Sequence, residues 1–117
     1  MVRLHDTLGS ALLVASIAFT VCAGLLAFAG GPVRALGPAW KVVVAGVALQ
    51  GLIGGALLVS DERPTEGLHL LYGVLALLVL PAAAAFSSEA PPRARAAVLA
   101  FAGLVTTGVL MRSLGTG

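Results

Sequence analysis

The chain contains two histidines, His5 and His69, whose side chains are the best candidates for chemistry in an otherwise apolar sequence. An imidazole nitrogen binds transition metals, and two opposed imidazoles can occupy the two axial positions of one haem iron. We therefore interpret His5 and His69 as candidate ligands of a single b-type haem. The competing interpretation is that both histidines are ordinary residues of the membrane interface.

A glycine follows each histidine by four residues, Gly9 after His5 and Gly73 after His69. Residues four apart lie on the same side of a helix, so each glycine leaves room for a flat porphyrin beside its ligand. Because the chain has 15 glycines, such spacings also arise by chance. The glycines therefore fit a haem site without identifying one.

Three arginines are candidate anchors for haem propionates, because a guanidinium pairs well with a carboxylate. They are Arg3, Arg63 and Arg112. Tyr72 lies close to His69 in the sequence, and we expect it to hydrogen-bond a propionate or to line the pocket. Arginine and tyrosine are also common anchors where helices leave a membrane, so a purely structural role is the alternative.

Other chemistries find less support in the residues. Zinc normally requires three or four protein ligands, and two histidines with Asp6 or Glu66 make an incomplete set. No phosphate-binding loop, nucleophile motif or cysteine pair occurs, and the single cysteine, Cys22, is interpreted as a packing residue. We therefore predict no catalytic site, and we interpret the net charge of +2 as a determinant of topology rather than of nucleic-acid binding.

The elements that must position the histidines are predicted by composition. Hydrophobic residues make up 59% of the chain and charged residues 10%, against about 25% charged residues in soluble domains. The charges separate four uncharged stretches at residues 7–33, 42–60, 67–88 and 96–111. Three exceed about 17 residues, the practical minimum for a membrane-spanning helix, and the fourth reaches it if Arg112 extends to the interface.

We therefore predict an all-α integral membrane protein, an up-down-up-down bundle of four helices at about residues 6–30, 40–60, 66–87 and 94–112. Residues 1–117 form one domain in this interpretation. The first segment could instead be a cleaved signal peptide ending at Ala27-Phe28-Ala29, but its apolar run is longer than usual, and we expect it to be retained.

Four crossings place both termini and both histidines at one face of the membrane, with the first and third helices parallel and diagonally opposite. His5 precedes its apolar run whereas His69 lies inside its own, an offset of about 6 Å that tilt or a longer first helix must absorb. The other face carries four basic residues against Glu89, namely Arg34, Lys41, Arg93 and Arg95. The positive-inside rule places that face in the cytoplasm, so we expect non-cytoplasmic termini in a cell (inner) membrane.

The second helix is rich in glycine and includes a Gly51-x-x-x-Gly55 spacing, which we interpret as intramolecular packing rather than a dimer face. Gln50 lies within the same helix and is expected to hydrogen-bond inside the bundle. Its expected partners are the hydroxyl groups of other helices: Ser16, Thr20, Thr106 or Thr107.

Residues 63–73 match the pattern R-P-x-x-x-L-H-x-x-Y-G, with Arg63, His69, Tyr72 and Gly73 at its fixed positions. In this pattern the C-terminal half resembles a group of small four-helix membrane proteins from bacteria with GC-rich genomes, which implies the fold but no activity. A looser similarity, carried by His5 and His69 alone, is to b-type membrane cytochromes and the haem A synthase group. It implies at most one haem per protomer.

Three functions remain open from the sequence. The first is binding of one haem b for electron transfer or haem handling in the outer half of the membrane. The second is a non-catalytic accessory or assembly subunit of a larger membrane complex. The partners expected besides the lipid bilayer are such a complex or a second copy of the chain in a homodimer. The third is a small transporter, although all five acidic residues lie outside the apolar stretches, where a proton-coupled transporter would place a carboxylate in mid-membrane.

Overall fold

The computed structural model describes residues 2–31, 33–59 and 67–116. They form four α-helices: α1 (Val2–Ala29), α2 (Leu36–Val59), α3 (Gly67–Phe86) and α4 (Pro92–Thr116). A short 3₁₀ turn, η1 (Val33–Ala35), precedes α2. No strand occurs in these described ranges, and the fold is an all-α bundle, as the sequence predicts.

Each helix contains a stretch long and apolar enough to cross a membrane: Arg3–Ala29, Leu36–Ala56, His69–Phe86 and Pro92–Ser113. The helices form because lipid cannot hydrogen-bond the backbone, which must then satisfy its own polar groups. The bundle is 47 Å long, which exceeds the roughly 30 Å of a hydrocarbon core. The helix ends therefore extend into the interfacial layers of the bilayer.

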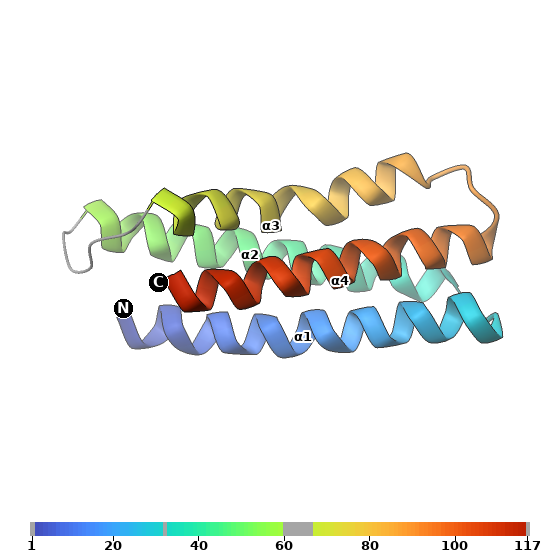
Figure 1. Cartoon of the computed structure of the whole chain (residues 1–117), viewed down its shortest axis with the longest axis horizontal. Coiled ribbons are helices and arrows are strands. Elements are labelled where there is room, and N and C mark those ends of the chain that lie inside the picture. Colours follow the sequence, from blue (N-terminus) through green and yellow to red (C-terminus); the bar gives the residue numbers. More distant parts are fainter. Residues whose placement is uncertain (1, 32, 60–66, 117) are drawn as a thin grey trace.

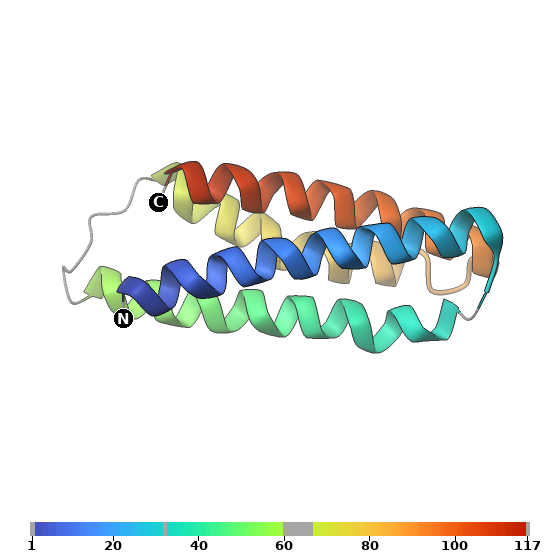
Figure 2. The ribbon, with the colours of Figure 1, turned by 90° about the horizontal axis from the view of Figure 1, so that it is seen from below.

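The helices run alternately up and down, and the N- and C-termini lie at the same end of the bundle (Figure 1). Both α1 and α3 pack against α2 and α4, which places α1 and α3 diagonally across the bundle (Figure 2). The most extensive contact joins α1 to α4. The first turns of α1 and α3 and the last turn of α4 consequently meet at one end, which is called the terminal end below.

The helices are longer at several ends than the uncharged stretches suggest. α1 already begins at Val2, so His5 lies inside the helix instead of preceding it. This extension absorbs the offset in depth expected between the two histidines. At its other end α1 stops at two glycines, Gly30 and Gly31, whose φ angles of 77° and 146° lie in the left-handed region that favours glycine.

The core has two parts. The larger one lies toward the end opposite the termini and includes Phe19, Leu80 and Leu99. The smaller one is a layer formed by one buried residue from each helix: Leu12, Val47, Ala76 and Leu110. This layer separates the larger core from the terminal end.

Hydroxyl groups join α1 to α4 within the apolar bundle. The Ser16 and Thr107 hydroxyl oxygens lie 2.6 Å apart, and both residues are buried. Gly103 lies opposite Phe19 and Thr20, where an added Cβ would be 2.5 Å from the Thr20 Oγ1 atom. A small residue at position 103 therefore allows the close approach of α1 and α4.

Two expectations about α2 are wrong. Gln50 does not bond any of the four hydroxyl residues named for it, because its amide nitrogen donates to the backbone oxygen of His5 at 2.6 Å. The Gly51-x-x-x-Gly55 spacing does not mark packing between helices within the chain, since a Cβ added at either glycine would meet nothing within 4 Å. The helix-packing glycines of α2 are Gly46, which faces Leu12, and Gly54, which faces His5.

Candidate functional site

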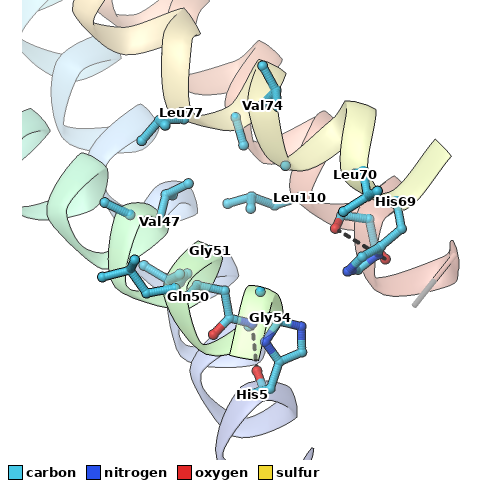
Figure 3. Close-up of a pocket in the computed structure, with 18 of the residues that line it drawn as sticks. His5, Val47, Gln50, Gly51, Gly54, His69, Leu70, Val74, Leu77 and Leu110 are labelled. Atoms are coloured by element: carbon cyan, nitrogen blue, oxygen red, sulfur yellow. Dashed lines mark hydrogen bonds between the residues drawn. The ribbon is translucent and has the colours of Figure 1, made fainter. Parts of the chain in front are cut away.

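A cavity of about 560 Å³ lies at the terminal end of the bundle and receives residues from all four helices. Its inner end is the four-residue layer described above, and the end nearest the termini contains His5, Gln50, His69 and Ser113. Figure 3 labels His5, Gln50 and His69 at that end. From His5 to Leu12 the wall descends about 10 Å along α1. The volume lies within the range of roughly 300–1,000 Å³ that is typical of small-molecule sites.

His5 enters the cavity from α1 and is held by α2. Its side chain is 8% exposed. The backbone oxygen can only accept a hydrogen bond, so the Gln50 amide nitrogen is the donor in the 2.6 Å bond between the two residues. One turn further along α2, a Cβ added at Gly54 would lie 3.0 Å from the His5 Cε1 atom. The absence of a side chain at Gly54 therefore lets the imidazole pack closely against α2.

His69 enters from α3 and is held by α4. Its Nδ1 atom lies 3.0 Å from the backbone oxygen of Ser113 and 3.4 Å from the Ser113 hydroxyl. Ser113 is among the last four residues of α4, whose carbonyl groups have no partner within the helix. Because a carbonyl only accepts, the Nδ1 atom carries the proton, and in the neutral imidazole the lone pair then belongs to Nε2.

The two imidazoles meet across the bundle. Their ring centroids are 6.1 Å apart and their planes are inclined by 60°. Two metal–nitrogen bonds of about 2 Å, together with the half-widths of two rings, give a separation of about 6 Å for imidazoles on opposite sides of one metal ion. The centroid distance is therefore compatible with two imidazoles that would hold one metal centre between them.

The number of available side-chain ligands limits which metal centre the two histidines could bind. The described residues contain no group of three or more histidine, cysteine, aspartate or glutamate side chains that could bind one metal ion. Two imidazoles alone leave the coordination shell of a bare ion incomplete. A haem would bring four nitrogen ligands of its own, so His5 and His69 would be enough to hold its iron.

The other predicted site residues have different positions. Gly9 is buried and lines the cavity, and Gly73 is exposed and also lines it. The side chains of Arg3 and Arg112 are exposed and do not line the cavity, and neither does the half-buried Tyr72. Arg63 lies outside the described residues.

The structure brings further residues to the cavity that sequence reasoning did not assign to a site. They are Gln50, Gly54 and Ser113, which contact the histidines, and Asp6, which lines the exposed end of the cavity. The Gln50 Oε1 atom is buried and has no hydrogen-bond partner among the described residues. One sequence signal could have indicated Ser113: it lies in the last turn of α4, where the backbone carbonyl groups have no hydrogen-bond donor within the helix.

Comparisons with known proteins return no match to a family model, a curated protein or a solved structure.

Proposed function

We propose that this chain is a multi-pass protein of the cell (inner) membrane that binds one haem b through His5 and His69. The observation that carries the proposal is the 6.1 Å separation of the two imidazole rings at the end of a cavity of about 560 Å³. The bound haem would supply a one-electron redox centre. Electron transfer or haem handling is therefore the proposed role.

The residues around the histidines fit this role. Metal-bound histidine usually donates its second ring N–H to a carbonyl or carboxylate, which fixes the tautomer. The Ser113 carbonyl is such an acceptor for His69, and it directs the lone pair to Nε2. Gln50 bonds the His5 backbone oxygen and Gly54 lies against the His5 imidazole, so each histidine is contacted by a helix other than its own.

We also propose that the site lies on the non-cytoplasmic side of the membrane. The end of the bundle opposite the termini carries Arg34, Lys41, Arg93 and Arg95 against the single acid Glu89. Lys41 lies 5.8 Å from the centre of the Trp40 ring, an arrangement suited to the membrane interface. If this basic end faces the cytoplasm, the two histidines lie near the non-cytoplasmic surface of the membrane.

The test is the absorption spectrum of detergent-purified protein from haem-supplied cells, recorded before and after dithionite. We expect a Soret band and a sharpened α band on reduction, both lost in His5→Ala and in His69→Ala. Ser10→Ala is the matched control, because Ser10 is exposed on α1 and its hydroxyl bonds the Asp6 backbone oxygen within its own helix. Protein that stays colourless after exposure to haem refutes the proposal.

A colourless protein that purifies together with a larger membrane complex would instead support the accessory-subunit function. Substrate-dependent flux in liposomes would support the transporter. Both outcomes are read from the same purified material.

A further inference from the structure

The residues that line the cavity differ in exposure between the four helices. On α1 and α4 the lining residues Gly9, Leu12 and Leu110 are buried. On α2 and α3 several lining residues are instead exposed: Gly51, Leu52, Gly55, Leu70, Gly73 and Val74. The cavity therefore opens between α2 and α3, and these six residues are called the rim.

The rim faces lipid rather than water. Leu52 is 74% exposed and Val74 is 54% exposed, and both lie inside the membrane-spanning stretches Leu36–Ala56 and His69–Phe86. The rim consists of glycine, leucine and valine and carries no charge. An exposed apolar surface at this depth borders acyl chains, because the hydrocarbon region excludes water.

Glycines keep the rim open. Beyond the adjacent residues and the backbone of its own helix, a Cβ added at Gly51, Gly55 or Gly73 would meet no atom of the described residues within 4 Å. The Gly51-x-x-x-Gly55 spacing, which does not mediate packing within the chain, thus lies at the edge of an opening. Larger side chains at these positions would narrow the opening without displacing the packed helices.

We propose that the cavity is filled laterally from the bilayer, through the opening between α2 and α3. Its ligand is accordingly a flat, apolar molecule dissolved in the membrane, with its metal or polar centre near the histidines. This inference rests on the proposed ligand site, and it adds the route and the source of the ligand. Haem is an amphipathic member of this class, because its macrocycle is apolar whereas its two propionates are charged.

The experiment follows ligand uptake by ligand-free protein in liposomes. Donor vesicles carry either haem or iron-free protoporphyrin, and binding is read from the induced circular dichroism of the porphyrin band. Gly55→Phe and Gly73→Phe place rings at the rim. Gly108→Phe is the control, since Gly108 is exposed on α4, lies outside the cavity and would likewise meet nothing within 4 Å.

We expect the two rim variants to take up both porphyrins at least tenfold more slowly than the wild type, and the control variant to match the wild type. Uptake at the wild-type rate in both rim variants, or no uptake of either porphyrin from vesicles by the wild type, overturns lateral entry. Iron-free porphyrin that enters slowly past the altered rim, while haem shows no ligation spectrum, supports lateral entry and refutes the proposed haem ligation. Rim variants that have lost stability are recognised by their unfolding in detergent, and Gly51→Leu, a smaller obstruction, then provides the test.

Discussion

Replacing Gln50 with leucine separates the stability of the bundle from the function of the cavity. Gln50 makes one hydrogen bond, from its amide nitrogen to the His5 backbone oxygen, and its own Oε1 atom is buried without a partner among the described residues. The substitution removes the bond and the unsatisfied oxygen together. The two effects on the free energy of unfolding have opposite signs.

The magnitudes favour a gain in stability. A hydrogen bond between membrane helices contributes about 0.6 kcal/mol on average. A buried polar atom without a partner costs about 1–3 kcal/mol. Gln50→Leu should therefore leave the free energy of unfolding unchanged or raise it by up to about 2 kcal/mol.

The same substitution should weaken ligand binding. Without the bond from Gln50, the first turn of α1 is less fixed, and His5 must be ordered when the ligand binds. Ordering one such group costs about 0.5–1.5 kcal/mol, which corresponds to a two- to tenfold loss of haem affinity. Leu49→Ala serves as the control on α2, because Leu49 is exposed and does not line the cavity, and it should preserve the affinity.

Both quantities are measured on the same purified variants. Stability is read from helical circular dichroism during unfolding in mixed detergent and sodium dodecyl sulfate micelles, and affinity from haem titration of the Soret band. If Gln50→Leu lowered the free energy of unfolding by more than about 1 kcal/mol, the main role of the Gln50 hydrogen bond would be to stabilise the bundle. Unchanged affinity would refute the positioning of His5 by Gln50.

Three further experiments test other parts of the structure. Gly103→Ala should destabilise the bundle by about 1–3 kcal/mol through overpacking, whereas Gly108→Ala, which meets no neighbour, should be neutral or stabilising in the same unfolding assay. Thr107→Val breaks the buried hydroxyl pair with α1 and should cost about 0.6–1.7 kcal/mol, measured by the same unfolding; no loss would mean that the pair adds nothing to packing. Exchanging both Arg93 and Arg95 for glutamate should give mixed or inverted topology, read as reduced activity of a C-terminal alkaline phosphatase fusion. An inactive wild-type fusion would contradict the proposed orientation, and an unchanged signal in the variant would show that the two arginines do not set it.

The number and depth of the helices were predictable because charge and apolarity vary along the chain. Charged clusters mark where the chain leaves the hydrocarbon, and the uncharged stretches between them reveal the spans. This criterion detects the part of a helix in hydrocarbon, not its continuation into the interface. It therefore missed the start of α1 at Val2 and the end of α4 at Thr116.

The rotation of each helix about its own axis was less predictable. Apolar residues cover every face, so no polar stripe shows which face points into the bundle. The error over Gln50 shows the consequence. Its expected partner Ser16 lies about 16 Å further along α1 than the residue it contacts, His5. The actual acceptor is a backbone carbonyl, which has no signature in the sequence. Parallel helices with histidines at one end were visible in the sequence, but the 6.1 Å separation of the rings was not.

Both histidines depend on helices that are distant in sequence, which has a consequence for how the site forms. The environment of His5 depends on α2, because Gln50 bonds its backbone oxygen and Gly54 lies against its imidazole. That of His69 depends on the last turn of α4, because the Ser113 carbonyl accepts a hydrogen bond from its Nδ1 atom. Neither α1 nor α3 alone provides the contacts that surround its own histidine. The pair therefore forms only after all four helices have associated. A ligand that binds across the pair stabilises the assembled bundle in proportion to its concentration.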